Sequence, residues 1–213
     1  MIINLPIGIV GSNCIVLFDD ATKIGAVIDP GILDAGPVKT VIDQHAVQIA
    51  YILNTHGHFD HTAGNGLLHH QPVKLALHPA DRDLLLAGGG AALFGLDYPT
   101  SPEPDMALED NAVLTLGELD VRALHTPGHT PGCVSFYIEK VNTVITGDTL
   151  FQGSVGRTDL PGGDEQVLLH SLKSYLTLPD ETIVMPGHGP SSSLREERIR
   201  NPWLRYVIHH ETI

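Results

Sequence analysis

One short stretch of the chain holds four side chains that can bind metal ions. It reads Thr55-His56-Gly57-His58-Phe59-Asp60-His61. Imidazole nitrogens and carboxylate oxygens suit zinc, iron and manganese, and no thiolate is needed. Four such groups in six residues would crowd one ion but can supply two. In extended backbone His56, His58 and Asp60 share one face, and a helix starting near residue 61 would turn His61 back to them. The glycine between the first two histidines lets the backbone take angles that other residues resist.

Three further segments each place one potential ligand after an apolar, strand-like run. His129 lies in Thr-Pro-Gly-His-Thr-Pro-Gly, Asp148 in Ile-Thr-Gly-Asp-Thr, and His188 in Met-Pro-Gly-His-Gly. Alone, an aspartate after a strand is usually a helix cap, and a single histidine is often structural. Together with the first stretch they form one pattern, because open α/β sheets place their sites just past strand ends.

The elements that would position these residues mix strands and helices. Apolar runs bounded by turn residues predict strands at Cys14–Phe18, Ile24–Ile28, Ala50–Leu53, Val73–Leu77, Val113–Leu116, Leu119–Leu124, Val134–Ile138, Thr143–Thr146 and Thr182–Met185. Helices are predicted at Pro37–His45, Ala63–His70, Pro79–Ala87 (with Asp81 and Asp83 in its first turn), Glu165–Leu176 and Leu194–Arg200. The Gly- and Pro-rich stretch Gly88–Asp105 is long enough for a lid or binding loop. We expect one layered α/β domain, residues 1–213, with two similar sheets.

The composition of the 213-residue chain argues against several classes of protein. Its formal net charge of −13 would repel nucleic acid at long range. No apolar run reaches the ~18 residues of a membrane span, and the N-terminal segment lacks the basic residue of a signal peptide. Cys14 and Cys133 make no disulfide framework, which indicates a reducing compartment or a protein indifferent to redox conditions. We expect a cytoplasmic protein, a monomer or small homo-oligomer, that acts on a small molecule.

The motifs resemble those of the metallo-β-lactamase-fold superfamily. T-H-G-H-F-D-H, T-P-G-H-T-P-G, T-G-D-T-L-F and P-G-H-G-P occur in that order, after V-I-D-P-G at residues 27–31. The resemblance implies an α/β fold, a four-layer αββα sandwich with metals at one edge. It also implies a role for each candidate ligand: His56, His58 and His129 for a first ion, Asp60, His61 and His188 for a second, Asp148 as the bridge, and Asp29 to steady the metal-binding loops.

Within the superfamily the chain looks like the glyoxalase II branch, which hydrolyses hydroxyacyl-glutathione, typically S-lactoylglutathione. The segments that carry this likeness are residues 146–151, Gly-Arg-Thr-Asp at 156–159, and Glu197-Arg198 with Asn201-Pro202. The expected cofactors are two divalent ions, zinc first, with iron or manganese as alternatives. Two ions that share a water lower its pKa from 15.7 toward ~7, and one ion can polarise a carbonyl group. Asp60 and Asp148 are the expected catalytic carboxylates.

A thioester fits this chemistry better than an amide. A thiol has a pKa near ~8.5 and can leave as thiolate, and the sequence shows no separate general acid. Arg157 stands where long glyoxalase II enzymes carry a basic residue for glutathione, and arginine suits carboxylate recognition; a surface ion pair is the alternative. Because only twenty-five residues follow His188, we expect the chain to lack the helical glutathione-binding domain of those enzymes. We expect Gly88–Asp105 to replace it in part, with Phe94 and Tyr98 lining the pocket.

The sequence also leaves other functions open. A persulfide dioxygenase resembles the chain in the same motifs but uses one iron, held by the residues matching His56, His129 and Asp148. A β-lactamase is disfavoured because that branch usually bridges with cysteine and is exported. A nuclease conflicts with the charge of −13 and the lack of a basic tract. A metal-free binding module would be expected to have lost ligands, and all seven are present.

Overall fold

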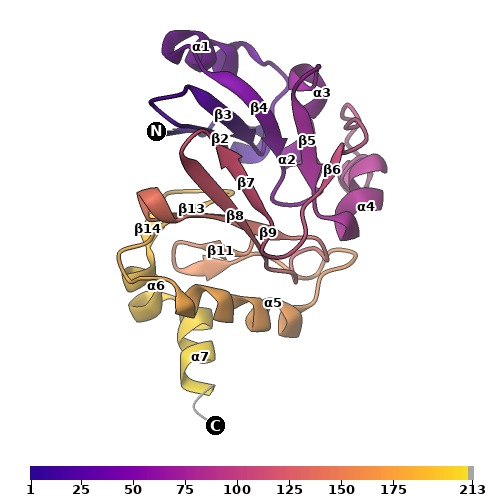
Figure 1. Ribbon diagram of the computed structural model, residues 1–213. Helices are drawn as coiled ribbons and strands as arrows, with labels where there is room; N and C mark the ends of the chain where they lie inside the picture. The colour runs from indigo at the N-terminus through magenta and orange to yellow at the C-terminus, as the bar shows by residue number, and fades with distance from the viewer. Residues whose placement is uncertain (211–213) are drawn as a thin grey trace.

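Two six-stranded sheets face each other in the computed structural model, which describes residues 1–210 (Figure 1). The first sheet has the order β1 (Ile2–Leu5), β2 (Cys14–Phe18), β3 (Ile24–Ile28), β4 (Gln48–Leu53), β5 (Lys74–Leu77) and β6 (Met106–Ala107). The second has the order β14 (Ser192–Ser193), β13 (Ile183–Pro186), β10 (Thr143–Gly147), β9 (Val134–Ile138), β8 (Leu119–His125) and β7 (Val113–Leu116). Strands β11 (Leu150–Phe151) and β12 (Ser154–Val155) form a separate antiparallel pair.

Helices form the two outer layers. Beside the first sheet lie α1 (Gly36–His45), α2 (Phe59–Thr62), α3 (Asn65–Leu68) and α4 (Arg82–Leu86). The second sheet is covered by α5 (Glu165–Ser171), α6 (Leu194–Arg200) and α7 (Pro202–His210). Short 3-10 turns are η1 (Ile9–Gly11), η2 (Pro79–Asp81), η3 (Ala91–Phe94), η4 (Glu139–Val141) and η5 (Leu172–Thr177). The expected αββα sandwich is thus confirmed. None of the helices within residues 1–210 is long and apolar enough to cross a membrane.

Three apolar cores lie between the four layers, and strand β2 contributes to two of them. Its alternate residues Ile15 and Leu17 face the core between the two sheets. Cys14, Val16 and Phe18 face the core under α1. A strand buried on both faces has to be apolar throughout, and all five residues of β2 are. The third core lies between the second sheet and the C-terminal helices, and it includes the fully buried Leu168 and Tyr175.

Several predicted helices differ in length from the observed ones. The helix expected from about residue 61 begins at Phe59, so Asp60 is helical rather than extended. The helix expected at Ala63–His70 covers only Asn65–Leu68. Here tertiary contacts override the local pattern, because the Gly64 amide donates to the Pro30 carbonyl at 2.7 Å, outside any helix. The expected helix Glu165–Leu176 continues past Ser171 as a 3-10 turn, and Pro79–Ala87 starts as one.

Strand direction brings the ligand-bearing loops to one edge. Strands β3 and β4 are parallel, as are β10 and β13. Strand β8 also runs in the direction of β10, because both pair antiparallel with β9. The carboxyl ends of β3 and β4 therefore share one edge of the first sheet, and those of β8, β10 and β13 share one edge of the second.

Candidate metal centre

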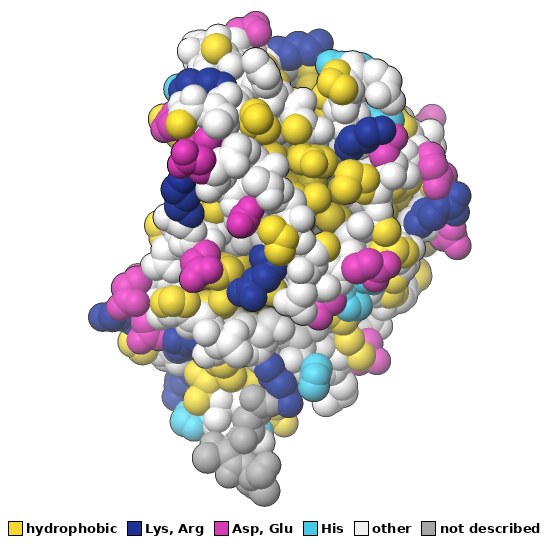
Figure 2. Space-filling view, viewed as in Figure 1, with side chains coloured by type: hydrophobic (Ala, Val, Ile, Leu, Met, Phe, Trp, Pro, Cys, Tyr) yellow, Lys and Arg dark blue, Asp and Glu magenta, His cyan; other side chains and the backbone are white. Residues whose placement is uncertain are grey.

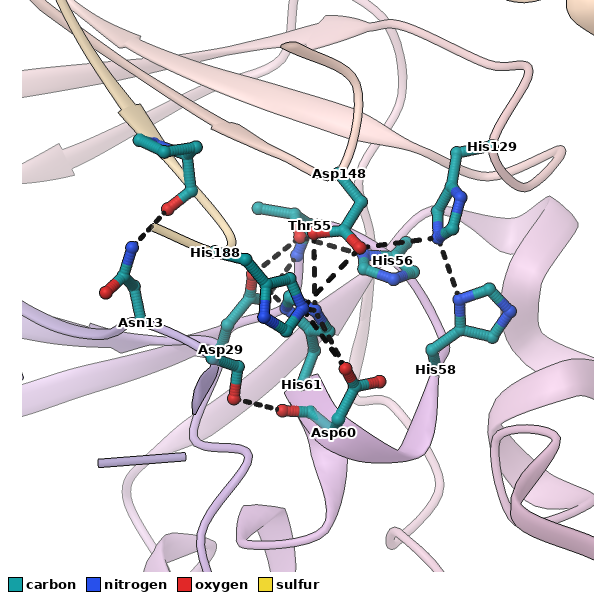
Figure 3. Close-up of polar contacts among 12 residues, drawn as sticks. Asn13, Asp29, Thr55, His56, His58, Asp60, His61, His129, Asp148 and His188 are labelled. Atoms are coloured by element: carbon teal, nitrogen blue, oxygen red, sulfur yellow. Dashed lines mark hydrogen bonds and ion pairs between the residues drawn. The ribbon is translucent and has the colours of Figure 1, made fainter. Parts of the chain in front are cut away.

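Every predicted ligand follows the carboxyl end of a strand. Residues 56–61 come after β4, and His129 lies in the turn after β8. Asp148 directly follows β10, and His188 comes two residues after β13. Figure 3 shows all seven side chains pointing into one space between the sheets.

Three imidazoles form the first group. Ligand atoms of His56, His58 and His129 lie within 4.8 Å of one another, and all three residues are buried. His58 Nδ1 lies 2.9 Å from His129 Nε2. This is the set that the family resemblance assigns to the first ion.

A carboxylate and two imidazoles form the second group: Asp60, His61 and His188. His188 Nε2 lies 3.2 Å from His61 Nε2 and 3.2 Å from Asp60 Oδ2. His61 Nε2 lies 3.6 Å from that same carboxylate oxygen. These three residues match the set expected for the second ion.

The Asp148 carboxylate lies between the two groups (Figure 3). Its Oδ2 is 3.6 Å from His129 Nε2 and 3.7 Å from His188 Nε2, while Oδ1 is 3.4 Å from His61 Nε2. Contact with both groups is what a bridging ligand requires.

Two buried polar atoms without hydrogen-bond partners, and the spacing of the donor atoms, fit bound metal ions. Within residues 1–210, His56 Nε2 and Asp148 Oδ1 are buried without a hydrogen-bond partner. An unsatisfied buried polar group is costly, and a cation would relieve both. Donors that bind zinc at about 2.0–2.1 Å in a tetrahedron lie about 3.3 Å apart. The separations between facing donors here run from 2.9 to 3.7 Å.

Asp29 and the Arg157 carbonyl orient two of the imidazoles. The Asp29 carboxylate accepts hydrogen bonds from His61 Nδ1 at 3.0 Å, the Thr55 hydroxyl at 2.6 Å and the Thr55 amide at 2.7 Å. His129 Nδ1 donates to the Arg157 carbonyl at 2.7 Å. Each bond leaves the Nε2 of its histidine directed at the centre. Such partners fix the ring and its tautomer.

Asp81 is a positioning residue that sequence analysis assigned to the first turn of a helix. It is fully buried, and its carboxylate accepts from the Gly57 amide at 2.8 Å, the Thr130 hydroxyl at 2.6 Å and the Gly132 amide at 2.6 Å. One carboxylate thereby joins the loop of His56 and His58 to the loop of His129. Gly57 has no positive φ, so the reason expected for it is wrong; an added Cβ would lie only 3.0 Å from the Asp81 carbonyl oxygen.

Replacing Asp81 by asparagine should lower activity and first-site metal affinity about 10- to 100-fold, the usual effect of losing a ligand's outer partner. The amide presents one NH₂ to donors that need an acceptor, so buried donors are left unpaired. Metal titration and steady-state kinetics would measure both effects. Asp83→Asn is the matched control, since that side chain is 96% exposed on the adjoining helix α4. Equal behaviour of the two variants would contradict the role of Asp81.

The electrostatics divide the histidines into two kinds. Burial and neighbouring imidazoles lower the pKa of His56 well below its usual value, and burial with His129 lowers the pKa of His58 to about 3. Burial also disfavours charge on His61, but the carboxylates of Asp148, Asp60 and Asp29 outweigh it and raise its pKa to about 10. At neutral pH the first two imidazoles therefore have free lone pairs, and His61 carries a proton that a metal would displace.

We expect metal uptake at pH 7 to release about one proton from His61. Because protonated His61 cannot bind a cation, affinity at the second site should rise with pH until the pH reaches about 10. Calorimetric titrations at one pH, in buffers with different protonation enthalpies, would count the proton. The His61→Asn variant should release less. Proton release that is absent, or unchanged in the variant, would contradict the assignment.

A cavity of about 340 Å³ opens onto the centre. His58, Asp60, His129, Asp148 and His188 form its floor. Phe94 and Arg157 line its wall, as sequence analysis expected, although the Arg157 guanidinium also pairs with Asp159 at 2.7 Å. Tyr98 is not among the lining residues; it stacks on Phe59 with ring centroids 5.2 Å apart.

Comparisons with known proteins agree with this geometry. The family model of the metallo-beta-lactamase superfamily matches residues 7–188. The chain is 34% identical to "Probable metallo-hydrolase YqgX" of Bacillus subtilis, covering 94% of this chain and 96% of the relative. It is also 34% identical to hydroxyacylglutathione hydrolase GloC of Haemophilus influenzae, with the same coverage. Identity to the human mitochondrial persulfide dioxygenase ETHE1 is 31%, over 88% of this chain and 69% of that one.

Two solved structures superpose closely. A B3 metallo-beta-lactamase, BLEG-1, has a TM-score of 0.87 at 38% identity, covering 96% of this chain and 99% of its own. A protein solved in a di-iron-bound form has a TM-score of 0.85 at 36% identity, covering 95% and 100%. A neighbour of this fold therefore holds two metal ions.

Proposed function

This chain belongs to the metallo-beta-lactamase superfamily, and from that premise we propose that it hydrolyses thioesters at a centre of two divalent metal ions. His56, His58 and His129 would hold one ion, and Asp60, His61 and His188 the other, with Asp148 between them. When bound, the ions would lower the pKa of a bound water toward about 7 and polarise the substrate carbonyl. Zinc is our first choice, with iron or manganese as alternatives.

The residues of the cavity wall carry the proposal. Within residues 1–210, the titratable side chains that line the cavity are five of the proposed metal ligands and Arg157, whose guanidinium stays protonated. No separate acid is therefore placed to protonate a leaving group. A thiolate can leave without a proton, whereas an amine leaving an amide cannot. The wall thus favours a thioester.

The chain's own groups would prepare the reaction. Asp29 and the Arg157 carbonyl hold the rings of His61 and His129 toward the centre. The carboxylates of Asp60 and Asp148 offset the charge of two cations. Burial opposes ionisation of Asp60, but His61 and His188 keep the pKa of its carboxyl below the usual range.

The proposal also names the thiol portion of the substrate. We propose a glutathione conjugate such as S-lactoylglutathione, supported by the likeness to hydroxyacylglutathione hydrolase GloC. A small molecule, rather than a nucleic acid, suits a surface whose Lys and Arg side chains lie in small separate groups on the face shown in Figure 2. We also propose a single domain, of which residues 211–213 lie outside the described part, and a cytoplasmic location. The thiols of Cys14 and Cys133, which are buried and form no disulfide, suit a reducing compartment.

Two assays on the same metal-loaded sample would test the proposal. We expect thiol release from S-lactoylglutathione and no oxygen uptake with glutathione persulfide. Oxygen uptake without thiol release would instead support a persulfide dioxygenase, the alternative that the likeness to the human relative suggests. Faster cleavage of a β-lactam than of any thioester would overturn the proposal in favour of the activity named for BLEG-1.

A further inference from the structure

The cavity beside the metal centre has a wall of leucine and phenylalanine side chains. Leu93, Phe94 and Leu96 come from one loop, residues 88–96, and Leu84 from the preceding helix α4. Leu160 also lines the cavity. We call these five residues the apolar wall. Nothing in the proposed cleavage of a small polar acyl group requires it.

The glycines at the start of the loop fix the wall against the metal-binding segment. Gly88, Gly89 and Gly90 all have positive φ angles, which glycine adopts without strain. The Gly89 carbonyl accepts a hydrogen bond from the Phe59 amide at 3.0 Å, and a Cβ on Gly89 would lie 2.3 Å from that nitrogen. Phe59 follows the ligand His58 directly. The wall therefore has a defined place beside the reacting atoms.

The exposure of the wall points to a ligand. Leu93 is 61% exposed, Phe94 50% and Leu96 40%. Adjacent exposed apolar side chains that rim a cavity mark a binding site more often than chance surface. Because the cavity floor holds the metal ligands, the substrate itself is the occupant that this position favours.

Few side chains around the cavity could pair with a negatively charged group of a ligand. Within residues 1–210, Arg157 is the one Lys or Arg side chain that lines the cavity, and Asp159 already pairs with it through two bonds of 2.7 Å. Glutathione carries two carboxylates and an ammonium group. The apolar wall instead complements a hydrocarbon group.

We propose that the apolar wall is a subsite for a hydrocarbon group, aliphatic or aromatic, that is attached to the thioester and is larger than the methyl group of lactate. The inference rests on the proposed function and adds the class of substrate. The hydrocarbon belongs to the acyl side or to the thiol side of the thioester, and two substrate series distinguish these sources.

In the first series the acyl group grows from acetyl to butanoyl, hexanoyl and octanoyl on a fixed thiol, N-acetylcysteamine. In the second an acetyl group is fixed and an alkyl thiol grows. We expect kcat/KM to rise roughly two- to fourfold per methylene in one series until the wall is covered, the effect of burying a CH₂ group. The Leu93→Ala/Leu96→Ala double variant should flatten that rise. Ile199→Ala, at a 64% exposed position on α6, should keep it.

Binding measurements distinguish a failure of the subsite proposal from a failure of the proposed thioesterase activity. Acetate, butanoate, hexanoate and lactate, titrated into metal-loaded protein, should bind more tightly as the chain grows, whether or not thioesters are cleaved. Cleavage with flat dependence in both series and flat carboxylate binding would overturn the subsite and leave the thioesterase standing. The same flat result, with a dimer that the double variant dissociates, would assign the wall to an interface between two copies of the chain.

Discussion

Replacing Asp148 by asparagine is expected to lower thioester hydrolysis more than about 100-fold and bound metal from two ions to one or fewer. Loss of an outer partner of a ligand already costs about 10- to 100-fold, and Asp148 is expected to ligate both ions. Its carboxylate contacts both donor groups, at 3.6 Å from His129 and 3.4 Å from His61. An asparagine keeps the shape but loses the negative charge and offers one acceptor oxygen.

Steady-state kinetics and metal analysis on the same preparation would measure this prediction. Asp120→Asn is a matched control, because Asp120 is exposed on β8 and its carboxylate accepts a hydrogen bond from the Thr115 hydroxyl. The control should keep both activity and metal. An Asp148→Asn enzyme that keeps two ions, or near-normal turnover with fewer, would show that the bridging role is wrong.

Removing the metal is expected to stop activity and lower Tm by about 5–15 °C. Metal-free, the site leaves His56 Nε2 and Asp148 Oδ1 buried without partners within the described residues. A ligand at 100 to 1,000 times its Kd stabilises a protein by about 3–4 kcal/mol. For a chain of this size each kcal/mol shifts Tm by about 2–4 °C.

Chelation followed by dialysis and calorimetry would measure the shift, and adding back zinc, iron or manganese separately would restore both Tm and turnover. The ion that restores the highest turnover identifies the working metal. A metal-free protein with unchanged Tm and full turnover would contradict the metal centre, and unchanged Tm with lost turnover would contradict only its contribution to stability.

The sequence predicted which side chains gather at one site, because the signal for each of them is local. Each follows a strand, and strand ends are visible as an apolar run that stops at Gly, Pro or a polar residue. The resemblance then supplied the grouping of His56, His58 and His129, which the geometry reproduces. The fold could be predicted for the same reason, since β2, apolar throughout, indicates a strand covered on both faces.

What escaped sequence analysis depends on contacts between distant segments. Asp81 looked like an ordinary acid in the first turn of a helix, yet its three donors lie 24, 49 and 51 residues away. Leu93 and Leu96 lie in a stretch without periodicity, so their common face could not be predicted. Tyr98 has the side chain expected of a pocket residue, but stacking on Phe59 places it elsewhere.

Metal quantification on the natively purified protein, together with a thioester assay of the same sample, tests the central claim most directly. We predict about two transition-metal ions per chain and thiol release that rises in proportion to metal content. Fewer than one ion per chain after purification without chelators, or hydrolysis that does not depend on the metal, would contradict a binuclear hydrolytic centre.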